Sequence, residues 1–120
     1  MAGSRRAARL VRRFREHPLR AEVEAAAERY HELPYDLAVE GHPPHGVIDL
    51  LYRDGAGRWA IVDFKTDHLR GPDELAQAEA KARPQVERYR AAVARLLGAA
   101  PLVKLCFLDY DGQAIVREPS

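Results

Sequence analysis

Residues 46–66 read Gly46-Val-Ile-Asp-Leu-Leu-Tyr-Arg53, Asp54-Gly-Ala-Gly57 and Arg58-Trp-Ala-Ile-Val-Asp-Phe-Lys-Thr66, and this stretch decides the fold. Its two outer runs are rich in aliphatic and aromatic residues, and the glycine-bearing segment between them is typical of a turn. The stretch therefore predicts a β-hairpin.

Charged residues interrupt both apolar runs. Side chains alternate along a strand, so Asp49 is expected on the same face as Val47 and Leu51, and Asp63 on the same face as Lys65. Burying charge there is costly unless the groups pair with each other or bind a metal. Two interpretations follow: a divalent-metal site for phosphodiester hydrolysis, or a buried Asp–Lys salt bridge that closes the hairpin.

In the first interpretation, the ligands are oxygens, which hard cations such as Mg²⁺ prefer and which also suit Mn²⁺. Asp49 and Asp63 would supply carboxylates, and the backbone carbonyl of Phe64 a further oxygen. Lys65 would bring a positive charge to the same cavity and stabilise the negative charge that builds on phosphorus.

The rest of the chain predicts an α/β sandwich with a mixed central sheet flanked by helices. A helix between strands permits a right-handed crossover and a parallel strand pair. Pro34 suggests an edge position for the first strand. The expected elements are helices at about 4–16 and 19–30, a strand at 32–40, a turn at 41–45, the hairpin, a loop at 67–72, a helix N-capped by Asp73, another helix from Pro84 to Gly98, and strands at 102–110 and 114–117.

Apolar spacing also predicts which side chains are buried. On the first helix these are Leu10, Val11 and Phe14, and on the helix before Gly98 they are Val86, Val93, Leu96 and Leu97. The single cysteine, Cys106, lies in an apolar run and is expected in the core.

Composition excludes several classes of protein. A chain of 120 residues with a formal net charge of +1 fits one globular domain. One cysteine excludes an internal disulfide and a four-cysteine iron–sulfur cluster, and it fits a reducing cytoplasm. We find no apolar stretch long enough to span a membrane and no secretory signal, so no membrane partner and a cytoplasmic location are expected.

The first twenty residues carry seven arginines against one glutamate. An Arg-rich amphipathic helix can track phosphates, which makes Arg5, Arg9, Arg12 and Arg13 candidates for DNA contact. The alternative is a solvated helix face. We predict that residues 1–31 form a basic helical segment packed on a core of residues 32–120.

The order Gly46-x-x-Asp49, Asp63-x-Lys65 and Gln85-x-x-x-Tyr89 resembles the motifs of the RecB-type branch of the PD-(D/E)XK nucleases. More narrowly, Glu32-Leu-Pro-Tyr and Val-Asp-Phe-Lys-Thr-Asp look like the nuclease domain that ends bacterial UvrD-like helicases of the AddA type. The resemblance covers about residues 30–98. It implies a restriction-endonuclease-like fold and a metal-dependent deoxyribonuclease, with Asp49, Asp63 and Lys65 catalytic and with Gln85 and Tyr89 lining the site.

The chain departs from the family pattern in one respect. The family usually has a further metal-ligand histidine in a Gly-x-x-x-His-like helix upstream, and no such spacing occurs in the N-terminal region. The resemblance therefore suggests an N-terminally truncated domain, with DNA and a helicase domain or subunit as partners. The alternative is a catalytically incomplete module that contacts DNA or docks on a helicase. His17 and His31 are the only histidines upstream of the first predicted strand.

Overall fold

The computed structural model describes residues 2–36 and 45–119. Within them the chain forms a five-stranded sheet between two layers of helices, as expected for the α/β class. The elements in chain order are α1 (Ala2–Glu16), α2 (Pro18–Glu24), β1 (Glu28–Asp36), β2 (His45–Arg53), β3 (Trp59–Lys65), α3 (Pro72–Leu97), β4 (Leu102–Tyr110) and β5 (Gln113–Arg117).

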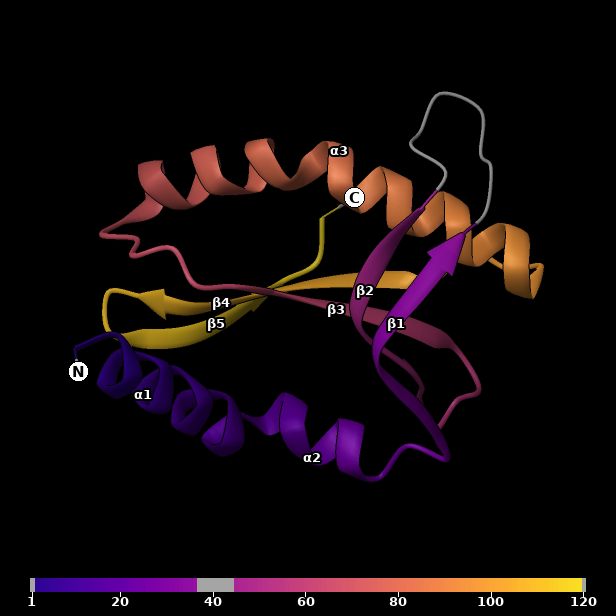
Figure 1. Cartoon of the computed structure of the whole chain (residues 1–120), viewed down its shortest axis with the longest axis horizontal. Helices are drawn as coiled ribbons and strands as arrows, with labels where there is room; N and C mark the ends of the chain where they lie inside the picture. Colours follow the sequence, from indigo (N-terminus) through magenta and orange to yellow (C-terminus); the bar gives the residue numbers. More distant parts are fainter. Residues whose placement is uncertain (1, 37–44, 120) are drawn as a thin grey trace.

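The strands lie in the order β1-β2-β3-β4-β5. Neighbouring strands are antiparallel except β3 and β4, which run parallel. Helix α3 connects this parallel pair, as a crossover connection requires. Figure 1 shows α1 and α2 on one face of the sheet and α3 on the other. The predicted hairpin is β2–β3, and the proline-bearing strand β1 is at the sheet edge, as predicted.

Each face of the sheet has its own apolar core. On β3, Ile61 belongs to the core under α3, whereas Ala60 and Val62 belong to the core under α1 and α2. This alternation is the period of two expected for a strand buried on both faces. Cys106 is fully buried in the α1–α2 core, which confirms its predicted place.

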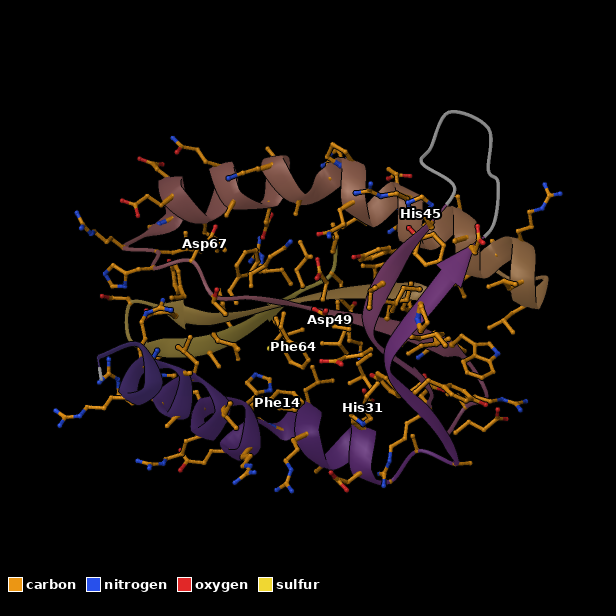
Figure 2. The ribbon with its side chains drawn as sticks, in the orientation of Figure 1. Phe14, His31, His45, Asp49, Phe64 and Asp67 are labelled. Atoms are coloured by element: carbon orange, nitrogen blue, oxygen red, sulfur yellow. The ribbon has the colours of Figure 1, made fainter. Side chains whose placement is uncertain are left out.

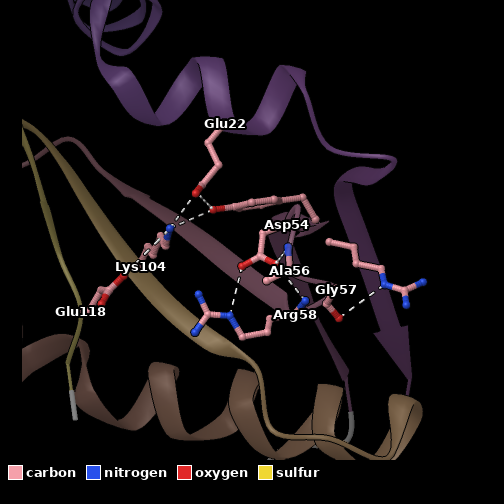
Figure 3. A network of polar contacts seen from close by, with 9 residues as sticks. Glu22, Asp54, Ala56, Gly57, Arg58, Lys104 and Glu118 are labelled. Atoms are coloured by element: carbon pink, nitrogen blue, oxygen red, sulfur yellow. Dashed lines mark hydrogen bonds and ion pairs between the residues drawn. The ribbon is translucent and has the colours of Figure 1, made fainter.

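A polar network fastens α2 to the sheet (Figure 3). The ammonium of Lys104 on β4 donates to Glu22 of α2 at 2.8 Å and to the Tyr52 hydroxyl of β2 at 3.0 Å. The Tyr52 hydroxyl also donates to Glu22. Burial, followed by the Glu22 hydrogen bond, raises the pKa of Tyr52 to about 12, so this hydroxyl stays protonated at neutral pH.

The predicted helix over 19–30 is too long. Helix α2 ends at Glu24, and residues from Glu28 onward pair with β2, beginning with Glu28 opposite Arg53. Strand pairing therefore overrides the helix propensity of this Ala/Glu-rich segment. Strand β1 runs from Glu28 to Asp36 rather than over 32–40, and residues 37–40 of that prediction and residues 41–44 of the predicted turn lie outside the described part of the chain.

Helix α3 is continuous through Pro84, where a new helix was predicted. Pro84 is on the exposed side of α3, so the carbonyl that loses its usual donor faces solvent rather than the core. The helix begins at Pro72 with Gly71 at the N-cap, so Asp73 lies in the first turn and is not the cap. It ends as predicted at Gly98, whose φ of 76° suits a left-handed C-cap.

Three of the apolar side chains predicted to be buried are exposed: Val11, Leu96 and Leu97. Leu10, Val86 and Val93 are buried as predicted. Leu96 and Leu97 lie in the last turn of α3 and are 55% and 41% exposed. In the described residues, no helix combines the length and the apolar character needed to cross a membrane.

Candidate active site

The site forms where β2 separates from β3. The two strands pair only from Leu50 opposite Val62 to Arg53 opposite Trp59, although β3 continues to Lys65 and stays paired with β4. Ile48 and Leu51 both belong to the core under α3, whereas Leu50 belongs to the core on the opposite face. The simple alternation is therefore broken around Asp49, and the first part of β2 bends toward α3 (Figure 1).

Strand β1 is irregular at the same level. Glu32 lies between His31 and Leu33, which pair with Leu50 and Ile48, so Glu32 is level with Asp49. Its φ is 49°, a left-handed conformation that costs energy for a residue other than glycine. Its side chain is exposed. The two outer strands thus bend together away from β3.

Asp49 bridges the opening that this bend leaves (Figure 2). Its Oδ2 accepts a hydrogen bond from the backbone N–H of Phe64 at 2.9 Å. A carboxylate therefore takes the place of a strand partner for β3 at this point. The bond holds the Asp49 carboxylate beside the residues on either side of Phe64, which are Asp63 and Lys65.

Asp63 is the most deeply buried acid of the site. Its side chain is 5% exposed, and the Lys65 ammonium lies 3.1 Å from its Oδ2. Apart from this ion pair, that oxygen has no hydrogen-bond partner among the described residues. Burial raises the pKa of Asp63 to about 6; Lys65 acts in the opposite direction, and the nearby Asp49 carboxylate adds to the rise. The arrangement is a pair of neighbouring carboxylates, and one buried oxygen of Asp63 has no partner among the described residues beyond its ion pair with Lys65.

A chain of hydrogen bonds holds Lys65 from the side of α3. The Lys65 ammonium donates to Gln85 Oε1 at 2.7 Å, and Gln85 Nε2 donates to the Tyr89 hydroxyl at 2.9 Å. The hydroxyl donates in turn to the carbonyl of Val47 on β2 at 2.8 Å. An ammonium can only donate, so it sets the orientation of the Gln85 amide, and the four-residue spacing puts both helix residues on one face.

The Tyr89 hydroxyl stays protonated at neutral pH. Burial raises its pKa to about 12, and the Asp63 and Asp49 carboxylates act in the same direction. A protonated hydroxyl can donate to Val47, so the chain from Lys65 through α3 to β2 is complete. The structure therefore brings together five of the predicted residues: Asp49, Asp63, Lys65, Gln85 and Tyr89.

The donor set can be compared with the needs of a metal. No cluster of three His, Cys, Asp or Glu side chains arranged to hold a metal occurs in residues 2–36 and 45–119. Two carboxylates suit Mg²⁺, which usually binds one or two carboxylates and completes its shell with water and phosphate oxygens. They do not make the four-ligand nitrogen and sulfur set of a structural zinc site. The buried Oδ2 of Asp63, whose one ion-pair partner among the described residues is Lys65, is an oxygen of the kind that binds such a cation.

The four arginines predicted to contact DNA differ in their exposure to solvent. Arg5, Arg9 and Arg12 are exposed on α1, whereas Arg13 is turned toward the sheet. The Arg13 guanidinium donates to the carbonyl of Leu108 at 2.9 Å and to the Asp109 carboxylate at 3.1 Å. Arg13 therefore attaches α1 to β4.

The described histidines lie in different parts of the structure, and two of them, His17 and His68, make polar contacts. His17 caps α2, where its Nδ1 accepts from the backbone N–H of Leu19 at 3.0 Å. His31 is exposed on β1, and His45 is exposed at the start of β2. His68 Nδ1 lies 3.2 Å from the Asp109 carboxylate.

Asp109 is a residue that sequence reasoning missed. It is buried at the end of β4, and its carboxylate contacts Arg6, Arg13 and His68. Arg6 also donates to the carbonyl of Thr66, and the backbone N–H of Leu69 donates to the carbonyl of Asp109 at 2.9 Å. Asp109 thus fixes the segment that follows Lys65. An acid inside the apolar run 102–110 was the available signal.

The protein is of the α/β class, with a splayed mixed sheet that carries two acids and a lysine at its opening. The chain belongs to the PD-(D/E)XK nuclease superfamily, whose family model matches residues 2–116. A search of the curated proteins finds no match. Members of this superfamily are generally metal-dependent nucleases, so membership supports nuclease-type function and DNA binding.

Proposed function

We propose that this chain is a Mg²⁺- or Mn²⁺-dependent deoxyribonuclease domain that hydrolyses phosphodiester bonds. The observation that carries the proposal is the buried Oδ2 of Asp63, which lies near the Asp49 carboxylate and has no partner among the described residues beyond its ion pair with the Lys65 ammonium, 3.1 Å away. A buried carboxylate pair of this kind costs free energy, and a divalent cation would offset that cost. A plain Asp–Lys salt bridge would not need the second carboxylate.

Asp49, Asp63 and the backbone carbonyl of Phe64 would hold the cation. When bound, the cation supplies Lewis acidity toward the phosphodiester and toward the attacking water. Asp63 must be ionised to serve as a ligand, and its pKa of about 6 makes it ionised above neutral pH.

Lys65 would stabilise the charge that develops on the phosphate oxygens during attack. Its side chain is 24% exposed, so the ammonium is open to a substrate while its stem packs in the site. Gln85 and Tyr89 keep the ammonium from turning away, because the Gln85 amide is itself held by the Tyr89 hydroxyl. In this scheme Gln85 and Tyr89 are positioning residues.

The narrower assignment is an exonuclease linked to a helicase and to recombination repair, of the RecB and AddA type. Its support is the order of Glu32-Leu-Pro-Tyr, Asp49, Asp63-Phe-Lys65 and Gln85-x-x-x-Tyr89 along the chain. The structure adds that the last three of these motifs, far apart in sequence, meet at one opening of the sheet. A helicase partner is part of this proposal.

A second candidate function is a catalytically incomplete module that contacts DNA or docks on a helicase. One observation favours it: among the described residues no histidine or third acid joins Asp49 and Asp63 in a metal-ligating group. The two candidates differ in turnover, because only the first requires cleavage of DNA.

The test is cleavage of end-labelled single- and double-stranded DNA with Mg²⁺, Mn²⁺ or EDTA. Lys65→Ala is the informative variant, and Arg95→Ala, which removes an exposed cation in the last turn of α3, is the matched control. Metal-dependent cutting that Lys65→Ala abolishes and Arg95→Ala preserves supports the nuclease. Equal cutting by Lys65→Ala contradicts the proposed role. Absence of cutting by a folded wild-type protein favours the incomplete module.

A further inference from the structure

A groove leads away from Lys65 along the N-terminal half of α3. One hollow of about 280 Å³ is lined by Lys65, Gln85 and Phe107, among others. A second hollow, of about 410 Å³, is lined by His68, Leu69, Glu74 and Gln77, among others. Asp67, Ala78 and Lys81 line both hollows, so the two form one continuous groove. Figure 2 shows Asp67 between α3 and the sheet.

Residues of α3 line this groove at a regular spacing. Gln77 and Lys81 precede Gln85 and Tyr89 at steps of four residues, so each is a neighbour of the next along the helix surface, and the row turns gradually from the exposed Gln77 to the buried Tyr89. Each step corresponds to about 6 Å along the helix axis. Ala78 and Ala82 lie beside them, and their small side chains leave room for the hollows. The groove thus continues the hydrogen-bonded row of the site by two turns.

Lys81 is the one lysine without an ion pair or hydrogen bond among the described residues. Lys65 and Lys104 both have carboxylate partners. On α3, the residues three and four positions from Lys81 are Gln77, Ala78, Pro84 and Gln85, none of them acidic. The side chain is exposed and lines the groove, so its ammonium is available to an anionic ligand.

We propose that Lys81 binds the phosphate backbone of a DNA strand in this groove, next to the phosphodiester held at Lys65. The inference rests on the proposed function, because it takes DNA as the ligand of the Lys65 site. It adds a contact that none of the sequence motifs contains. An ammonium on a flexible stem recognises phosphate as a point charge, so the contact gives affinity and register without base specificity.

Asp67 limits where in the groove a phosphate of the DNA strand can lie. Its carboxylate lines both hollows and would repel a phosphate placed against it. The phosphate is therefore expected on the α3 side of the groove, between Lys81 and Lys65. The two residues predict opposite effects: loss of the Lys81 charge weakens DNA binding, and loss of the Asp67 charge strengthens it.

The experiment measures binding of a fluorescein-labelled single-stranded oligonucleotide by anisotropy, in EDTA so that no strand is cut. The variants are Lys81→Gln, Lys81→Arg and Asp67→Asn. Arg83→Gln is the matched control, because it removes an exposed cation of α3 that does not line either hollow. Kd is followed between about 50 and 200 mM salt, where each phosphate contact changes the slope of log K against log salt by about 0.7.

One lost contact predicts that the rise of Kd over this fourfold range is about 2.6-fold smaller for Lys81→Gln than for wild type. Lys81→Arg and Arg83→Gln should keep the wild-type slope, and Asp67→Asn should bind more tightly than wild type. An unchanged slope for Lys81→Gln, or no binding by the wild type, would overturn the inference. So would weaker binding by Asp67→Asn.

Cleavage separates this inference from the proposed function. If the wild type cuts DNA and Lys81→Gln binds and cuts as the wild type does, the subsite is wrong while the nuclease stands. If the wild type does not cut but Lys81→Gln lowers the salt slope, the subsite stands while the nuclease fails. If the wild type cuts DNA and Lys81→Gln lowers the salt slope, Lys81→Gln should raise KM and leave kcat nearly unchanged, since it removes a contact made equally before and during the reaction.

Discussion

Replacement of Asp63 by asparagine should stabilise the metal-free protein at pH 8. The side chain is 5% exposed, and its pKa is raised from 3.8 to about 6, chiefly by burial. A rise of about two units at about 1.4 kcal/mol per unit means that ionised Asp63 costs the folded state about 3 kcal/mol. An asparagine side chain has nearly the same shape and carries no charge, so Asp63→Asn should recover up to that amount.

The effect has a defined pH window. Between about pH 4 and pH 6 the unfolded chain releases the Asp63 proton while the folded chain keeps it, so the wild type loses stability as pH rises through this range. Asp63→Asn has no proton to release there. The two proteins should therefore differ little below pH 4 and by the full amount above pH 6.

The assay is urea unfolding followed by circular dichroism, in EDTA, at pH 4 and pH 8. Asp36→Asn, which changes an exposed acid on β1, is the control and should shift stability by no more than about 0.5 kcal/mol. Mg²⁺ at about a hundred times its Kd should add about 2.7 kcal/mol to the wild type and little to Asp63→Asn. The reasoning would be refuted if Asp63→Asn were the less stable protein in EDTA at pH 8.

Three further predictions concern the surroundings of the site. Gln85→Ala should lower kcat of the proposed cleavage by about tenfold or more at unchanged fold, because Lys65 loses its 2.7 Å acceptor, and circular dichroism beside single-turnover cleavage checks this. Asp109→Ala should lower the free energy of unfolding by about 3 kcal/mol, because it leaves the partly buried Arg13 without its carboxylate. Urea unfolding at pH 7 measures this loss, and a loss below about 1 kcal/mol would contradict the attachment of α1 to β4 through Arg13 and Asp109. Cys106, fully buried with a pKa raised by burial to about 12, should not react with a thiol reagent in the folded protein at pH 8 and should react in urea; rapid native labelling would show that β4 opens.

Short-range patterns predicted most of the elements. The strand over 102–110, the hairpin and the helix end at Gly98 were all predictable, because period-two alternation, turn residues and a C-cap glycine act within a few residues of one another. The helix over 19–30 failed where its propensity competed with a partner strand. The continuity of α3 through Pro84 depended on which side of the helix faces solvent.

For the candidate site too, the sequence predicted some features and not others. Motif spacing predicted that Asp49, Asp63 and Lys65 would lie together and that Gln85 and Tyr89 would share a helix face. It did not predict the bridge from Asp49 to the Phe64 amide, nor the row of hydrogen bonds from Lys65 to Val47. The Asp49 bridge lies where β2 leaves β3 just before Leu50, and the row of hydrogen bonds joins β3 to β2 through α3.

The sequence by itself thus determined which residues are chemically suited to the site, the order of the strands and helices that carry them, and the superfamily to which the chain belongs. The tertiary structure alone decided that Arg13 and Asp109 clamp α1 to the sheet, that the leucines at the end of α3 are exposed, and that Lys81 faces a groove. The physical reason is the separation in sequence over which each effect acts. Periodicity and turn chemistry act between near neighbours, whereas burial, charge pairing and the bend of a sheet depend on segments as far apart as residues 13 and 109.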